Sequence, residues 1–202
     1  MDLLYLTLIG GLLALDGTSV GQLMVSRPLV AGAITGWVVG DPVLGLLVGG
    51  IMEVYFISIF PVGGAEFPEG GPPTLVAVAT AAGVPGPGGI ALGALLGFLL
   101  SRLGARSVLI LRRINGRIVP DPSRMDVTPK RIVWAHLGAI ALEFLRGSAL
   151  SFGGLVVGAW LADRVGEAWP LGMSGTLVLL SVGACIPAGA FVGTLGGWTK
   201  RG

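Results

Sequence analysis

Clusters of glycine and proline divide this sequence into apolar segments, several of which are only 10 to 14 residues long. A helix needs about 20 apolar residues to cross the hydrocarbon layer of a membrane. Broken backbone exposed to lipid leaves amide groups unpaired, at a cost of several kcal/mol each. The breaks must therefore line a buried or watery cavity, as they do at the discontinuous helices of transporters. The short apolar segments are Leu3–Leu15, Pro28–Gly40, Thr74–Gly83 and Ile90–Leu103.

Three other segments are longer. Val43–Val62 is a full-length candidate span, and Gly63-Gly64 follows it. Ile132–Ala162 is long enough for one span and part of a second, and we expect a break near Gly147 or at Gly153-Gly154. Leu171–Gly197 is apolar but contains Pro187.

The stretch Glu66–Pro73 reads EFPEGGPP, with three prolines and two glycines in eight residues. Proline removes a backbone donor and clashes with the preceding turn, so this stretch is predicted to be irregular.

The composition agrees with a membrane location. Only 12% of the residues are charged and 53% are apolar, whereas a soluble domain has about 25% charged residues. The apolar content also excludes intrinsic disorder. We therefore predict an all-α, polytopic integral membrane protein with broken or re-entrant helices, in which residues 1–202 form a single membrane-embedded domain.

The charges are distributed unevenly along the chain. Residues 1–101 contain six acidic residues and one basic residue, and residues 102–202 contain five acidic and twelve basic residues. Eight of the basic residues lie between Arg102 and Arg131. We predict a basic loop at 104–131 that is solvated rather than bound to nucleic acid. The positive-inside rule places this loop in the cytoplasm.

Glycines four residues apart allow helices to approach closely in a membrane. The sequence has three such pairs, Gly32 and Gly36, Gly45 and Gly49, and Gly93 and Gly97. We expect these pairs to lie at helix–helix contacts.

Glu53 lies in the middle of the apolar segment Val43–Val62. A carboxylate at membrane depth is costly unless it is paired, protonated or hydrated, so it indicates a functional site. The alternative is a buried glutamate that only joins two helices.

Further polar residues lie near the expected breaks. Glu69 lies on the irregular stretch Glu66–Pro73, where carboxylates and free carbonyls suit sugar hydroxyls. Asp16, Gln22 and Arg27 lie just before the second apolar segment or at its start. Arg27 is interpreted either as a substrate contact or as the residue that neutralises Glu53 or Asp16.

His136 is the single histidine, and Glu143 and Arg146 follow on the same helical face. These residues indicate either a proton or substrate relay or a buried polar cluster that satisfies itself.

The sequence has no phosphate-binding loop, HExxH, GxSxG or CxxC motif, and Cys185 is its single cysteine. We therefore expect no catalytic residue, no metal site and no cofactor in this chain.

Several motifs occur in a specific order between residues 12 and 83. They are Arg27-Pro28-Leu29, a turn from Gly40-Asp41 to Gly45, the glycines and acid of Gly49-Gly50-x-x-Glu53, and Phe67-Pro68-Glu69. Trp134-Ala135-His136 follows in the second half. With these motifs in this order, the chain resembles the permease subunit IIC of the mannose/fructose/sorbose-type phosphotransferase system.

The resemblance implies a multi-pass sugar permease of the bacterial inner membrane. It implies a IID membrane subunit as partner, assembly into an oligomer, and cytoplasmic IIA and IIB proteins that transfer phosphate from phosphoenolpyruvate to the sugar. The phosphorylated histidines belong to IIA and IIB, so His136 is not expected to carry phosphate. The chain itself is then a permease, and the assembled complex is the phosphotransferase.

These inferences combine into one hypothesis. The sugar binds in a membrane cavity around Glu53 and Glu69, with Gln22 as a further contact, and IIB phosphorylates it there. In this hypothesis Arg27 holds a carboxylate in place and Asp41 caps its turn, and Asp16 and His136 are supporting polar residues. Two alternatives remain, an ion-coupled secondary transporter and a non-transporting membrane partner of a IID-type subunit.

Overall fold

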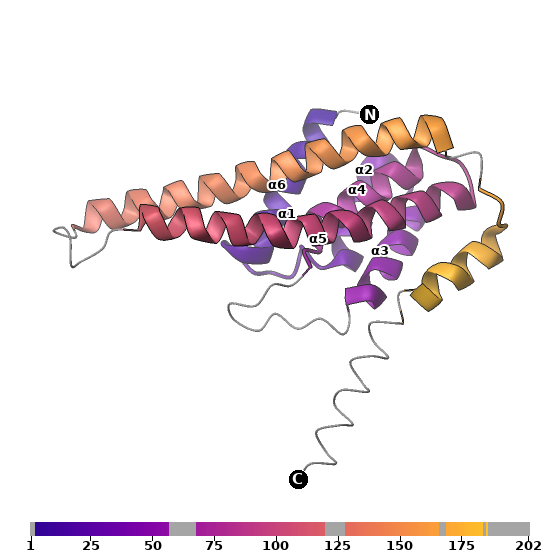
Figure 1. Cartoon of the computed structure of the whole chain (residues 1–202), viewed down its shortest axis with the longest axis horizontal. Helices are drawn as coiled ribbons and strands as arrows, with labels where there is room; N and C mark the ends of the chain where they lie inside the picture. Colours follow the sequence, from indigo (N-terminus) through magenta and orange to yellow (C-terminus); the bar gives the residue numbers. More distant parts are fainter. Residues whose placement is uncertain (1–2, 57–67, 120–127, 166–168, 184, 186–202) are drawn as a thin grey trace, which may run out of the picture.

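A computed structural model describes residues 3–56, 68–119, 128–165, 169–183 and 185 of the chain. All regular elements among these residues are α-helices, as predicted. Figure 1 shows their arrangement. They are α1 (Leu3–Thr18), α2 (Pro28–Val39), α3 (Pro42–Phe56), α4 (Gly71–Ala82), α5 (Pro87–Ile118), α6 (Pro129–Val165) and a short apolar helix at Met173–Gly183.

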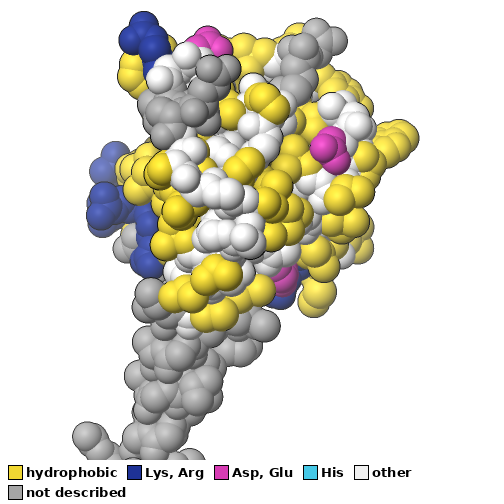
Figure 2. Space-filling model, turned by 90° about the vertical axis from the view of Figure 1, so that its right-hand side faces the viewer, with side chains coloured by type: hydrophobic (Ala, Val, Ile, Leu, Met, Phe, Trp, Pro, Cys, Tyr) yellow, Lys and Arg dark blue, Asp and Glu magenta, His cyan; other side chains and the backbone are white. Residues whose placement is uncertain are grey.

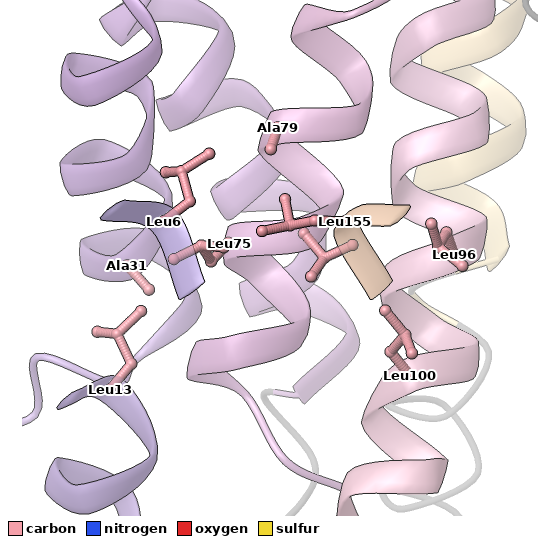
Figure 3. Packing of buried hydrophobic residues seen from close by; sticks show 9 residues of the cluster. Leu6, Leu13, Ala31, Leu75, Ala79, Leu96, Leu100 and Leu155 are labelled. Carbon is pink, nitrogen blue, oxygen red and sulfur yellow. The ribbon is translucent and has the colours of Figure 1, made fainter. Parts of the chain in front are cut away.

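The short helix α4 forms the centre of the fold. It contacts each of the other five numbered helices, and every residue from Gly71 to Ala81 is buried. Figure 3 shows Leu75 and Ala79 of α4 packed among leucines of neighbouring helices, which include Leu6 and Leu155. A twelve-residue helix is about 18 Å long and cannot span the hydrocarbon layer, but its residues from Gly71 to Ala81 are buried in protein and not exposed to lipid.

Helices α2 and α3 form an antiparallel hairpin with a closely packed interface. A Cβ atom added to Gly32 would lie 2.7 Å from the Cα of Gly49, and one added to Gly36 would lie 2.7 Å from the Cα of Gly45. The two glycine pairs therefore face each other, as expected. Gly40 turns the chain between the helices with a φ of 87°, which favours glycine.

Helices α5 and α6 are the two helices long and apolar enough to cross a membrane among the residues described. With 32 and 37 residues, they are about 48 and 55 Å long, which exceeds a hydrocarbon layer of about 30 Å. Figure 1 shows them side by side, extending past the short helices. In α5, Gly93 and Gly97 pack against Ala77 of α4, as predicted for the third glycine pair.

The predicted basic loop at 104–131 is wrong for residues 129–131, which begin α6, and for residues 104–118, which continue α5 as a helix. The cause is that this segment consists mainly of leucine, isoleucine and arginine and has no proline before Pro120. Leucine and arginine are strong helix formers, so a high charge density does not end the helix. Residues 120–127 lie outside the described part of the chain.

The predicted break in Ile132–Ala162 is also wrong, because α6 is continuous from Pro129 to Val165. The glycines taken as break points instead make room for neighbours. A Cβ on Gly154 would lie 2.6 Å from a methyl carbon of Leu100, and one on Gly147 would collide with the Cβ of Ala14. Close packing against two helices outweighs the low helix propensity of glycine.

Other predicted boundaries are only partly confirmed. The helix predicted at Val43–Val62 begins at Pro42 and is helical to Phe56, and the remainder lies outside the described residues. Of Leu171–Gly197, the described helix covers Met173–Gly183. In the irregular stretch Glu66–Pro73, α4 already begins at Gly71. Pro72 and Pro73 occupy its first turn, where the missing backbone donor costs little.

Much of the surface is apolar. Large hydrophobic side chains are exposed on several helices, for example Leu99 at 66% and Trp160 at 55%. Figure 2 shows one face of the molecule on which hydrophobic and uncharged groups prevail over charged side chains. Such a surface suits contact with lipid or with other membrane subunits.

Candidate functional site

A cavity of about 170 Å³ lies where the four short helices begin or end next to the middle of α5. Leu13 and Gly17 come from the last part of α1, Arg27 and Pro28 from the start of α2, and Phe56 from the end of α3. The irregular residues before α4 and three turns of α5 complete the wall. The lining residues there are Pro68, Glu69, Gly70, Gly71, Pro72, Ala105, Val108, Leu109 and Arg112, and Thr18 and Ser26 also line the cavity.

Two glycines bring the irregular segment before α4 close to its neighbours. A Cβ atom on Gly71 would lie 2.9 Å from the Cβ of Leu13, and one on Gly104 of α5 would lie 2.8 Å from the Cβ of Glu69. The backbone N–H of Glu69 also donates to the carbonyl oxygen of Ser101, at 3.1 Å. Glycine at these positions thus allows the segment to pass between α1 and α5.

Glu69 belongs to a buried ionic cluster on three segments of the chain. Nη1 and Nη2 of Arg146 donate to the two carboxylate oxygens of Glu69, at 2.9 and 2.6 Å. Nε and Nη2 of Arg146 also donate to Glu143, at 3.0 and 2.6 Å. Nη1 makes a further hydrogen bond of 2.8 Å to Oγ of Ser107 in α5. The three charged side chains are at most 9% exposed.

This cluster has one more carboxylate than guanidinium groups. Arg146 uses all three of its side-chain nitrogens within it, so the cluster holds α5, α6 and the segment before α4 in a fixed geometry. Paired charges are the form in which ionised groups tolerate burial. The sequence placed Glu143 and Arg146 on one helical face, but only the tertiary structure brings Glu69 to them.

Arg27 forms a salt bridge with Glu53, which joins the start of α2 to α3. The second oxygen of Glu53 accepts a hydrogen bond from the backbone N–H of Leu29, at 3.1 Å. Leu29 lies in the first turn of α2, where backbone donors have no partner within the helix. Glu53 therefore caps α2 from a neighbouring helix, and of this pair only Arg27 lines the cavity. Arg27 thus neutralises Glu53 and also lines the cavity.

Asp16 orders the segment between α1 and α2. Its two carboxylate oxygens accept hydrogen bonds from the backbone N–H groups of Leu23 and Ser26, at 2.7 and 2.8 Å. Gln22 has a φ of 49° in this segment and is exposed. Neither Asp16 nor Gln22 lines the cavity, although Ser26, which Asp16 holds, does.

Asp41 and His136 lie away from the cavity. Asp41 accepts a hydrogen bond of 2.9 Å from the backbone N–H of Leu44, so it caps α3 as predicted. His136 is exposed on the first part of α6 and does not join the cluster of Glu143 and Arg146. Among the described residues no group of three histidine, cysteine or acidic side chains could hold a metal ion.

Arg112 is the charged residue of the cavity wall that the sequence analysis did not identify. It was one of seven basic residues in the predicted loop at 104–131, and only the extension of α5 places it at the cavity wall. The sequence carries no signal that separates Arg112 from the adjacent Arg113.

Comparison with known proteins gives a family for the chain. A family model described as the sorbose-specific IIC component of the PTS, the phosphotransferase system, matches residues 1–194. A solved structure described as "Structure of membrane protein" is similar, with a TM-score of 0.72 and 19% sequence identity. That similarity covers 96% of this chain and 78% of the other, and it bears on the fold alone. No curated protein sequence matches the chain. By the extent of the family match and the agreement of the fold, this chain belongs to the sorbose-specific IIC component family of the sugar phosphotransferase system.

Proposed function

We propose that the cavity beside Arg27 and Glu69 binds the sugar that this membrane subunit of the phosphotransferase system handles, and that a cytoplasmic IIB protein phosphorylates the sugar there. The observation that carries the proposal is the position of the cavity. It lies at the irregular backbone between short helices, and both Arg27 and Glu69 line it. Polar groups that converge on a cavity with largely apolar walls are typical of small-molecule sites.

The size and chemistry of the cavity suit a small polyhydroxylated ligand. A volume of about 170 Å³ accommodates on the order of ten water molecules. Ser26 and Thr18 offer hydroxyl groups, which both donate and accept hydrogen bonds. The carboxylate of Glu69, which lines the cavity, is held in place by Arg146, so a hydrogen bond from the sugar to it would not carry the entropic cost of ordering a free side chain.

The roles of the predicted site residues follow from their positions. In our proposal Glu69 and Arg27 contact the sugar, and Glu53 positions Arg27 through their salt bridge. Asp16 maintains the backbone around the cavity through its hydrogen bonds to Leu23 and Ser26, and Asp41 caps α3 away from the cavity. Gln22 stays a candidate for a contact that forms when the segment between α1 and α2 rearranges around the sugar.

The family also suggests the surroundings of the chain. We propose a multi-pass subunit of the bacterial inner membrane that pairs with a IID subunit, forms an oligomer and depends on IIA and IIB proteins. The exposed apolar side chains of the short helices support contact with another membrane subunit.

The test uses membrane vesicles that contain the chain together with its phosphotransferase partners. Radiolabelled sorbose, fructose, mannose and amino sugars are supplied with phosphoenolpyruvate, and labelled sugar phosphate is measured. We expect one of these sugars to be phosphorylated in a reaction that requires both phosphoenolpyruvate and this chain. Accumulation of unmodified sugar that stops when ion gradients are dissipated would instead indicate an ion-coupled transporter.

Two glycine variants connect the reaction to the cavity. Gly17→Leu introduces a side chain at the cavity wall, where the nearest atom to an added Cβ is Oγ of Ser26 at 3.5 Å. Gly50→Leu is the control, because an added Cβ there meets no atom within 4 Å and Gly50 does not line the cavity. We expect Gly17→Leu to lower sugar phosphorylation at least tenfold and Gly50→Leu to leave it unchanged. Equal activity in the two variants, at equal membrane levels, would rule out this cavity.

A further inference from the structure

Arg112 differs from the other charged residues of the cavity wall because no described carboxylate neutralises it. The charge of Arg27 is balanced by Glu53, and Glu69 shares Arg146 with Glu143 in a cluster that carries one net negative charge. No described acidic side chain lies within 4.0 Å of Arg112. Among the described residues, Arg112 is therefore the guanidinium group of the cavity wall that has no carboxylate partner.

The exposed face of α5 shows where Arg112 lies relative to the membrane. Leu95 and Leu99 are 48% and 66% exposed, and the exposed residues Arg102, Arg106, Arg113 and Arg117 continue the same face. At 3.6 residues per turn, these six residues lie within an arc of about 60°. One face of α5 thus changes from leucine to arginine at Arg102, while Leu103, Ile110 and Ile114 stay exposed on other faces. We take the change on the arginine face as the boundary between lipid and water.

Arg112 lies ten residues beyond this boundary, or about 15 Å further along the helix. On this side the cavity is therefore bordered by an arginine that has no carboxylate partner among the described residues. Figure 1 shows that this part of α5 extends towards the end of the α5–α6 pair, past the short helices. A soluble protein can approach this side of the cavity without entering the membrane.

We propose that Arg112 binds the phosphoryl group at this cavity, both during its transfer to the sugar and in the sugar phosphate product. The inference rests on the proposed function, since it concerns the same cavity. The planar guanidinium group of arginine matches the oxygens of phosphate and binds them by charge-assisted hydrogen bonds. Positive groups that face a transferring phosphoryl group stabilise the charge on its equatorial oxygens.

The transfer step is balanced as follows. A sugar hydroxyl oxygen attacks the phosphorus of a phosphorylated histidine on the partner protein, so that a P–O bond forms and the P–N bond breaks. The hydroxyl proton is taken up by the leaving histidine nitrogen. Arg112 contacts the phosphoryl oxygens throughout and neither gains nor loses a proton.

The neighbouring residue Arg113 provides a matched control. It is also exposed on α5, but it does not line the cavity. The variants Arg112→Gln, Arg112→Lys and Arg113→Gln are purified in detergent together with the wild type. Two affinities are measured for each protein. The first is the affinity for the sugar that is found to be phosphorylated in the vesicle assay. The second is the affinity for the monophosphate of that sugar, and inorganic phosphate is used as a further probe.

We expect Arg112→Gln to weaken binding of the sugar monophosphate about tenfold or more, which is the loss of a charge-assisted contact. Its affinity for the free sugar stays within twofold of the wild type. Arg112→Lys retains part of the phosphate affinity, and Arg113→Gln changes neither affinity. In the vesicle assay, Arg112→Gln lowers the rate of phosphorylation at saturating sugar.

Two results would overturn the inference. One is an equal effect of Arg112→Gln and Arg113→Gln on phosphate affinity, and the other is an equal loss of sugar and sugar-phosphate affinity in Arg112→Gln. A wild-type protein that binds phosphate through Arg112 but binds no free sugar would support the inference and contradict the proposed function. A wild-type protein that binds neither ligand would contradict both.

Discussion

Arg146 and Glu69 form a bidentate ion pair although 77 residues separate them in the sequence. The pair joins the middle of α6 to the irregular segment before α4, and Glu143 and Ser107 complete the hydrogen bonding of the guanidinium group. The shape of the cavity therefore depends on a buried ionic cluster that also connects three separate segments of the chain.

The first prediction concerns the stability of this cluster. Arg146→Met leaves Glu69 and Glu143 buried without a cation, and breaking a buried pair in this way costs about 3–5 kcal/mol. We expect a clearly lower melting temperature in detergent. The triple variant Arg146→Met, Glu69→Gln, Glu143→Gln carries no buried charge at this position and should regain part of the loss. Lys130→Gln, at the exposed start of α6, serves as the control. The prediction would be contradicted if Arg146→Met melted at the same temperature as Lys130→Gln.

The second prediction concerns the crossing of α2 and α3. A Cβ added to Gly45 would lie 2.6 Å from the Cα of Gly36 and 2.9 Å from its backbone nitrogen. Because backbone atoms cannot move aside locally, Gly45→Ala should separate the two helices and destabilise the protein by about 1–3 kcal/mol. Gly50→Ala on the same helix meets no atom within 4 Å and should be neutral or slightly stabilising. Thermal unfolding of the two variants side by side tests this, and similar melting temperatures would show that the interface is looser than described.

The third prediction concerns Glu53. Glu53→Gln removes the negative charge that holds Arg27 at the cavity, and we expect it to abolish sugar uptake while membrane insertion stays intact. Asp41→Asn is the control, since asparagine also caps a helix well and Asp41 lies away from the cavity. Uptake of labelled sugar is compared at equal amounts of protein in the membrane fraction. Wild-type uptake by Glu53→Gln would remove this residue from the site.

The fourth prediction concerns the membrane boundary on α5. Single cysteines are introduced at Leu95, Leu99, Arg106 and Arg113 after Cys185→Ser has removed the native thiol. A membrane-impermeant maleimide should label the cysteines at 106 and 113 in inverted vesicles, where the cytoplasmic side faces outwards. The cysteines at 95 and 99 should remain unlabelled because lipid covers them. Labelling of 106 and 113 only in right-side-out cells would reverse the proposed orientation.

The sequence predicts the membrane class and the all-helical fold because these follow from local properties. Segments shorter than the hydrocarbon layer, few charges and glycine pairs four residues apart are all visible without coordinates. The same local rules fail at Gly147 and Gly154, where a glycine that weakens an isolated helix instead allows another helix to pack closely. They fail again at residues 104–118, a segment that was predicted to be a loop because of its many arginines but that forms a helix.

Part of the candidate site was also predictable. Glu53, Glu69 and Arg27 are polar residues in apolar or broken segments, and such residues are costly without a function or a partner. The partners could not be assigned, because Arg27 pairs with a residue 26 positions away and Glu69 with one 77 positions away. His136 has the residue type of a site but an exposed position on α6.

The sequence by itself determined that the chain is a helical membrane protein with interrupted spans, since hydrophobicity, helix breaks and charge bias depend only on neighbouring residues. The tertiary structure decided which carboxylates pair with an arginine and which arginine of the cavity wall has no carboxylate partner among the described residues. Arg112 and Arg113 are the same residue type one position apart, and the rotation of about 100° between successive residues of a helix turns only one of them towards the cavity.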